Sequence, residues 1–219
     1  MRTKYFYLSI LLLVSIQAVA SPEIQHWQTS KGAAVFFVEA HELPIVDIQI
    51  MFDAGGARDP QDNKGLAMLT NSLLDEAAAG LDADAISYEF ERLGAIYSAS
   101  SGYDSASVSL RSLSDKQKLT TALANLKRVI SSPDFPDKVL ERQRKRILIG
   151  IQRKQQSPAA LASDAFYTAI YNKHPYAFPN EGTQESITAI QRDDVVAFYN
   201  KHYTARNAVI AIVGDLDKQ

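Results

Sequence analysis

The sequence predicts an α+β fold in which a mostly antiparallel sheet packs against helices. Two runs near the start, residues 34–39 and 45–52, are rich in β-branched and aromatic residues, as strands are. Alternating small-residue runs flank Gly102, and a buried strand is predicted at 208–213. The segments between them repeat apolar residues at helical spacing. Strands, then helices, then a strand differ from regular βαβ alternation, so a wholly parallel sheet is not expected.

The elements are predicted in order from their patterns. Leu66, Leu69 and Leu73 form the apolar stripe of the first helix, and Ser114 is the expected N-cap of the third. A turn-rich break precedes the first helix at 53–60. The predicted strands are 34–39, 45–52, 95–101, 105–113 and 208–213, and the predicted helices are 65–76, one from 82 onward, 115–131, 137–156, 159–171 and 190–199.

Composition excludes several classes of protein. The chain has 219 residues, 46% of them hydrophobic and 22% charged, which is typical of a globular protein. Its formal charge of -2 gives no basic surface for nucleic acid. It has no cysteine, so disulfides, thiolate metal sites and cysteine nucleophiles are excluded. It also contains no G-x-S-x-G, P-loop or G-x-G-x-x-G motif.

The N-terminus is predicted to be a secretory signal peptide, residues 1–20. A short basic start precedes the apolar run 5–16, and Ala18-Val19-Ala20 fits a small-x-small cleavage site. An uncleaved anchor is the alternative, but the run is shorter than the about 20 apolar residues of a membrane span. We therefore expect a mature chain of residues 21–219 in the periplasm, with no further membrane span.

Several segments together resemble the pitrilysin/insulinase family of zinc peptidases, which includes the mitochondrial processing peptidases. The resemblance implies a single lobe of the processing-peptidase-like (LuxS-like) fold, with the family's second lobe absent from this chain. The segments that carry the resemblance are Gly55-Gly56-Ala57-Arg58-Asp59, Gly65-Leu66-Ala67, residues 93–101 with Asp104, His174-Pro175-Tyr176, Gly182-Thr183 with Ile187, and residues 198–215 ending in Val213-Gly214-Asp215.

The residues that carry the family's chemistry are replaced in this chain. Active members have the zinc motif H-x-x-E-H directly after Gly-Leu-Ala, and a glutamate on a later helix is the third ligand. The corresponding residues here are Met68, Asn71 and Ser72, with Gly150 at the third-ligand position. None of these four supplies the imidazole or carboxylate ligands of a catalytic zinc, and asparagine is no general base. Because glycine costs up to about 1 kcal/mol inside a helix, Gly150 predicts a close approach of two helices.

Other residues offer only weak candidates for a metal site. Asp75 and Glu76 either form a solvated helix end, as adjacent carboxylates usually do, or reach a metal. The histidines are scattered, and each is expected to be structural; a charged His202 would favour the C-terminal end of its helix. The histidines are His26, His41, His174 and His202.

A peptide-binding strand is the feature that the resemblance leaves intact. In active relatives an edge strand pairs with the backbone of the peptide, and it corresponds here to Ile96–Ser101. Ser98 stands where active members usually have asparagine, and Ala99 and Ser100 follow it. Main-chain pairing does not need catalytic side chains. The alternative is a small-residue strand packed under a helix.

The leading hypothesis is therefore a non-catalytic insulinase-family homologue. Its expected partner is a related zinc-bearing peptidase subunit, with which it would form a heterodimer and enclose peptide substrate. No cofactor is expected in this chain, and zinc is expected only in the partner. The alternatives are an active zinc metallopeptidase with unusual ligands and a stand-alone periplasmic peptide-binding or scaffold module.

Overall fold

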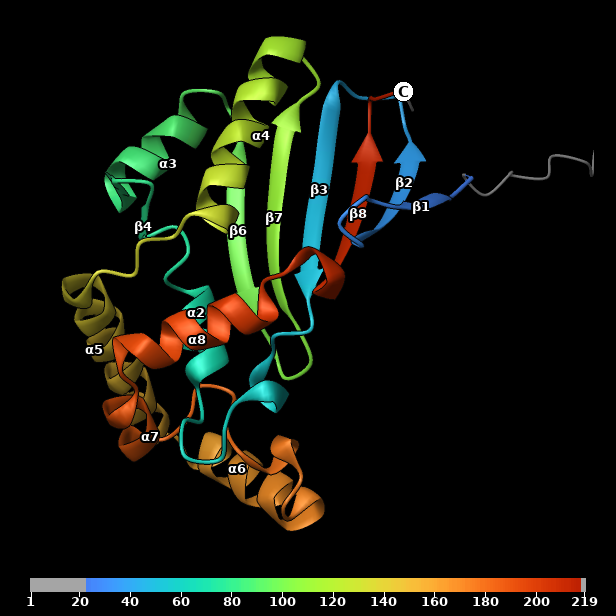
Figure 1. The fold of residues 1–219 in the computed structure, drawn as a ribbon. Coiled ribbons are helices and arrows are strands. Elements are labelled where there is room, and N and C mark those ends of the chain that lie inside the picture. Colours follow the sequence, from blue (N-terminus) through green and yellow to red (C-terminus); the bar gives the residue numbers. More distant parts are fainter. Residues whose placement is uncertain (1–22, 218–219) are drawn as a thin grey trace, which may run out of the picture.

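The main sheet is mixed and mostly antiparallel, which confirms the predicted fold class. The computed structural model describes residues 23–217 (Figure 1). Six strands lie in the order β1-β2-β8-β3-β7-β6, and only β2 and β8 are parallel neighbours. The strands are β1 (Gln25–Gln28), β2 (Ala34–Glu39), β3 (Ile45–Phe52), β6 (Ile96–Ser101), β7 (Ala106–Leu113) and β8 (Ala208–Gly214), and a separate small sheet pairs β4 (Ala77–Ala78) with β5 (Leu81–Asp82).

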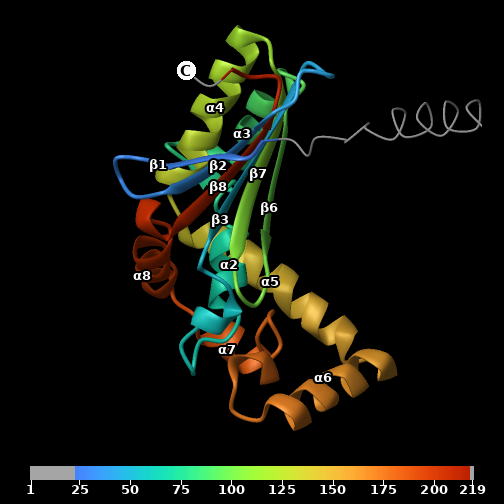
Figure 2. The same ribbon diagram turned by 90° about the vertical axis from the view of Figure 1, so that its right-hand side faces the viewer.

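Helices cover one face of this sheet. Helices α2, α3 and α4 contact β6 and β7, and α8 packs on α2 (Figures 1 and 2). Helices α5, α6 and α7 lie at one end of the sheet, where α6 projects away from it. The helices are α2 (Leu66–Asn71), α3 (Ala83–Glu91), α4 (Lys116–Ser131), α5 (Asp137–Lys154), α6 (Pro158–Tyr171), α7 (Gln184–Ala189) and α8 (Arg192–His202), with short 3-10 turns η1 (Gly56–Arg58), η2 (Pro175–Ala177) and η3 (Ala205–Asn207).

The core lies between the sheet and α2, α3, α4 and α8. Alternate side chains of a strand point to opposite faces of the sheet, and only one face packs into this core. In strand β2, Val35 and Phe37 are buried, while Phe36 between them is 43% exposed. Leu69 of α2 has no exposed surface and joins the same apolar cluster as Leu110 of β7. Burial of this continuous layer fixes where α2 sits against β6 and β7.

The opposite face of the sheet carries polar pairs between β6, β7 and β3. The hydroxyls of Ser98 and Ser109 are 2.7 Å apart. Arg111 donates to both carboxylate oxygens of Asp47 on the neighbouring strand, at 2.7 and 2.9 Å. Cross-strand pairs of this kind stabilise a sheet face that helices do not cover.

Two local predictions are wrong. The first helix ends at Asn71 rather than at 76, because bonds from Leu73 N–H to the Thr70 carbonyl and from Leu74 N–H to the Asn71 carbonyl tighten the chain into turns. The N-cap of α4 is Asp115, which accepts from the Lys118 N–H at 2.9 Å. Ser114 donates its hydroxyl hydrogen to Asp215 instead.

The predicted signal peptide, residues 1–20, lies outside the described residues. Within 23–217, no helix has the length and apolar character needed to cross a membrane. The strands β1, β4 and β5 and helix α7 were not predicted, because strands of two to four residues and a helix of less than two turns carry little periodic signal.

Candidate functional site

The position of α2 is set by a buried carboxylate at its N-terminus. Asp59 accepts hydrogen bonds from the Gly65 and Ala67 N–H groups, both at 2.7 Å. Gly65 has a left-handed φ of 91°, and a Cβ there would lie 2.6 Å from the Glu181 carbonyl oxygen, so this turn requires glycine. Burial raises the pKa of Asp59 to about 6. The Gly-Leu-Ala segment is thus an anchored helix start.

Three residues on and just after α2 are those that the sequence predicts at the family's zinc-motif positions, and two of them make side-chain hydrogen bonds. Asn71 is 2% exposed, and its side-chain NH2 donates to the Tyr203 hydroxyl at 3.2 Å. The Ser72 hydroxyl donates to the Leu69 carbonyl at 2.8 Å. Met68 is half-buried and offers only a neutral thioether, which binds zinc poorly. A catalytic zinc therefore does not fit this donor set.

The prediction of close helix packing at Gly150 is wrong. Gly150 lies in α5, is exposed, and a Cβ added to it would meet no atom within 4 Å. The absence of a side chain at Gly150 therefore does not serve the close packing of two helices. The position thus has room for a larger residue but supplies no ligand.

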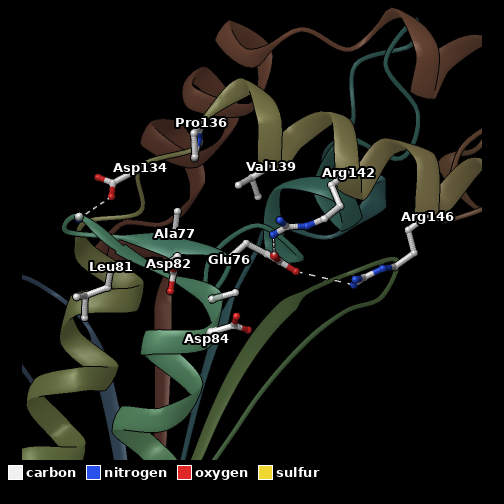
Figure 3. Close-up of a pocket in the computed structure, with 12 residues that line it drawn as sticks. Glu76, Ala77, Leu81, Asp82, Asp84, Asp134, Pro136, Val139, Arg142 and Arg146 are labelled. Atoms are coloured by element: carbon white, nitrogen blue, oxygen red, sulfur yellow. Dashed lines mark hydrogen bonds and ion pairs between the residues drawn. The ribbon is translucent and has the colours of Figure 1, made fainter.

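Glu76 links the segment after α2 to helix α5. Its carboxylate accepts from Arg142 and from the side-chain NH2 of Gln143, and Arg146 lies 3.8 Å away (Figure 3). Only 14% of the Glu76 side chain is exposed, so the expectation of a solvated helix end is wrong. We call Glu76, Arg142, Gln143 and Arg146 the Glu76 cluster. Three of them, Glu76, Arg142 and Arg146, line a cavity of about 640 Å3 (Figure 3).

Asp75, the neighbour of Glu76, has no ion-pair partner in the described part of the chain. Burial raises its pKa, and the charge of Glu76 raises it further. Over residues 23–217, the structure contains no group of three His, Cys, Asp or Glu residues arranged to hold a metal ion.

The histidines have structural contacts. His41 pairs with Asp215 at 2.8 Å, His174 Nδ1 accepts from the Tyr176 N–H at 3.3 Å, and His26 stacks on Phe36. His202 lies at the end of α8, but burial lowers its pKa. This shift disfavours the charged form of His202 that the sequence suggests for this helix end.

The candidate peptide-binding strand β6 is the last strand of the sheet, and within the described residues only β7 pairs with it. Ser98 and Ser100 lie on the face without helices, where Ser100 contacts the Ser107 hydroxyl at 2.9 Å. Ala99 faces the helices and is partly buried against the core. The three predicted residues therefore share one strand but not one face.

The sequence did not predict two features that shape this site. Arg144 of α5 is buried and donates to the Ile190 carbonyl at 2.6 Å and to the Ile187 and Thr188 carbonyls. It therefore holds α5 to α7 and the segment that follows. The second feature is the Glu76 cluster. The spacing of Arg142 and Arg146, four residues apart on one helix face, was its only sequence signal.

The chain belongs to the insulinase family of peptidases. The model of this family, Insulinase (Peptidase family M16), matches residues 34–184, and the model of the Peptidase M16 inactive domain matches residues 189–219. This confirms the resemblance and the processing-peptidase-like lobe. That Met68, Asn71 and Ser72 stand at the family's zinc-motif positions stays a prediction from the sequence.

Known relatives and solved structures agree with this assignment. The non-peptidase homolog YmxG of Helicobacter pylori is 26% identical over 97% of this chain and 49% of its own length. The crystal structure of a peptidase M16 inactive domain from Pseudomonas fluorescens is 42% identical, with a TM-score of 0.87, over 89% of this chain and 47% of that one. The periplasmic protease PqqL of Escherichia coli shares the fold, with a TM-score of 0.80 at 17% identity over 92% of this chain and 23% of that one.

The chain spans about half the length of the curated relatives it matches. An uncharacterized zinc protease of Rickettsia bellii, for example, is 23% identical over 89% of this chain and 48% of its own length.

Proposed function

We propose that this chain is the non-catalytic part of a two-part periplasmic peptidase, in which it holds peptide substrate while a zinc-bearing homologue cleaves it. One observation carries the proposal: within residues 23–217 the strand β6 pairs on one side only, which leaves an edge for a peptide. The residues that the sequence predicts at the four zinc positions are chemically unsuited to zinc, which supports a non-catalytic role. Residues 1–20 have the pattern of a signal peptide, and the name of the structural neighbour PqqL supports the periplasm.

Peptide binding at β6 follows from the chemistry of a strand edge. An edge strand presents unpaired N–H and C=O groups along one side, and an extended peptide satisfies them by adding a strand. The small side chains of Ser98, Ala99 and Ser100 leave room for the backbone of a neighbouring strand to approach. Affinity then comes mainly from main-chain hydrogen bonds, which the loss of zinc ligands does not remove.

Association with a peptidase partner is tested by pull-down. The tagged full chain is expressed in the native host, and proteins recovered with it are identified by mass spectrometry. We expect a related peptidase with an intact H-x-x-E-H motif, at near-equal amount. Recovery of the chain without any related peptidase contradicts the partnership and favours the stand-alone module.

Strand addition is tested with an uncharged fluorescent peptide and fluorescence anisotropy. Methylating alternate backbone amides on one set of positions should abolish binding, while methylating the other set leaves it, because only alternate amides face β6. The double variant Ser98→Lys and Ser100→Lys should weaken binding at least about tenfold by crowding the edge. Gln49→Lys, on the same face but in the internal strand β3, is the matched control.

The enzymatic alternative is tested separately. Purified protein is analysed for bound metal and for peptide cleavage that a chelator blocks. We expect neither stoichiometric zinc nor such cleavage. Finding both would overturn the non-catalytic assignment and favour an active peptidase with unusual ligands.

A further inference from the structure

Helix α6 turns its polar side chains toward the body of the protein. Asp164 forms an ion pair with Lys154 of α5 at 2.8 Å, and the Thr168 hydroxyl donates to the Ala177 carbonyl at 3.1 Å. Asp164 and Thr168 lie on one face of the helix, because they are four positions apart. The face of α6 that contacts the rest of the chain is therefore its polar face.

The outward face of the same helix is apolar. Phe166 and Ile170, also four positions apart, are 59% and 57% exposed, and Leu161 and Tyr167 at its sides are 48% and 43% exposed. No residue of α6 is buried, and Asp164 is its only charged residue. A surface helix normally turns its apolar stripe to the core. An exposed apolar face on a helix that projects from the sheet indicates an interaction surface (Figures 1 and 2).

A basic residue stands near each end of α6. Arg153, in the last turn of α5, precedes the helix, and Lys173 follows its last residue closely. Both side chains are exposed, and within residues 23–217 neither forms an ion pair. The only acid of α6, Asp164, is already paired with Lys154. The apolar face is thus flanked by two unpaired positive charges, which favours a negatively charged partner.

A second copy of the chain fits this face less well. Helix α6 has 14 residues, so it is about 21 Å long and about 10 Å wide. A contact between two such helices buries less than the about 1,200 Å2 of a stable interface. In either orientation the basic residues at the helix ends would also lie near those of the other copy, and their like charges would repel.

We propose that α6 binds the surface of an anionic lipid bilayer, with Phe166 and Ile170 in contact with its apolar layer. Arg153 and Lys173 then reach the lipid phosphates, as long basic side chains do at membrane interfaces. A helix of 14 residues is shorter than the about 20 of a membrane span, so α6 lies along the surface. This inference goes beyond the proposed function and does not depend on peptide binding at β6.

The test is sedimentation of the protein with lipid vesicles. The expected mature chain, residues 21–219, is used, because the apolar run 5–16 would bind vesicles by itself. The anionic vesicles contain equal amounts of phosphatidylethanolamine and phosphatidylglycerol, and the neutral ones contain phosphatidylcholine. We expect binding to the anionic vesicles to be at least about tenfold tighter than to the neutral ones, and to weaken at high salt.

Two pairs of basic residues test the role of charge. The double variant Arg153→Gln and Lys173→Gln should lose the preference for anionic vesicles. The matched control, Lys118→Gln and Lys127→Gln, changes two exposed lysines of α4 and should keep the preference.

Two pairs of apolar residues test the contact with the bilayer. The double variant Phe166→Gln and Ile170→Gln should bind anionic vesicles at least about tenfold more weakly, while glutamine keeps the helix. The matched control, Tyr88→Gln and Leu123→Gln, changes residues that are 63% and 39% exposed on α3 and α4, and it should bind like the wild type.

Other occupants of the α6 face are outcomes of the same experiment. No binding to any vesicle, or equal binding by the wild type and the Phe166→Gln and Ile170→Gln variant, overturns the proposal. Equal binding to neutral and anionic vesicles overturns the anionic surface. If the wild type instead self-associates in analytical ultracentrifugation and this variant does not, a second copy covers the face. Peptide binding at β6 is measured separately, so each of these outcomes leaves the proposed function intact.

Discussion

Helix α2 and strand β6 are neighbours in the fold, yet they differ in how much they depend on their side chains. In α2, Leu69 and Asn71 are buried and held by packing and hydrogen bonds, so each residue is fixed by its surroundings. In β6, Ser98 and Ser100 are exposed, and among the described residues only the backbone of β7 pairs with this strand. Side chains of α2 are therefore fixed by the core around them, whereas a strand edge whose contacts are made by the backbone can tolerate changes of side chain.

The largest expected effect tests this contrast directly. Leu69→Ala removes a side chain with no exposed surface and should lower the free energy of unfolding by about 3 kcal/mol, because it leaves a cavity in the core. The matched double variant Ser98→Ala and Ser100→Ala should cost about 0.5 kcal/mol or less. Both are measured by urea denaturation. Equal losses in the two variants would contradict the contrast.

The next prediction concerns the link between the segment after α2 and helix α5. Glu76→Ala leaves the Arg142 and Gln143 side chains without their acceptor and should cost about 2 kcal/mol, below the value for a fully buried pair because Arg142 is 48% exposed. Glu76→Gln keeps acceptor and donor groups and should cost less. Chemical denaturation compares the two, and a smaller loss for alanine than for glutamine would show that the cluster does not stabilise the fold.

A pH dependence should come from the carboxylate that anchors α2. Because burial raises the pKa of Asp59 to about 6, the native state binds a proton more tightly than the unfolded chain. Stability from this group therefore rises as the pH falls from 7 to 5, by about 1 kcal/mol. The difference between the wild type and Asp59→Asn, each followed by denaturation at both pH values, isolates this term. A difference that does not change with pH refutes it.

The smallest effect is expected at Gly150. Replacement by alanine should raise the free energy of unfolding by up to about 1 kcal/mol, because the position lies inside a helix and a Cβ meets no atom within 4 Å. Gly65→Ala, at a left-handed φ of 91°, is the opposite control and should destabilise the protein. Thermal melts distinguish the two signs. Destabilisation by Gly150→Ala would restore the idea of close packing there.

Strong periodic patterns predicted most of the fold. The bounds of β2 and β3 agree with the sequence because both runs are rich in the β-branched and aromatic residues that strands favour. Helices α5 and α6 agree within two residues at each end. The end of α2 was wrong because turns of the i→i+3 type depend on local hydrogen bonds that periodicity does not report.

The features of the candidate site also differ in whether the sequence alone could predict them. The sequence predicts that Met68, Asn71 and Ser72 replace zinc ligands, because ligand chemistry belongs to the residue type itself, and this stays a prediction. The surroundings of Glu76 were not visible, since its partners Arg142, Gln143 and Arg146 lie more than 60 residues further along the chain. The prediction of close packing at Gly150 was wrong for a similar reason, because a glycine in the sequence does not indicate which residues lie near it in the fold.

The sequence by itself therefore determined the family and the order of the main elements, since each is a property of residue types and their spacing. Only the tertiary structure decided that Asn71 is buried while Gly150 is open, that Glu76 contacts helix α5, and that β6 is the last strand of the sheet within residues 23–217. These features arise where distant segments pack together, and burial and charge at such places depend on every segment that meets there.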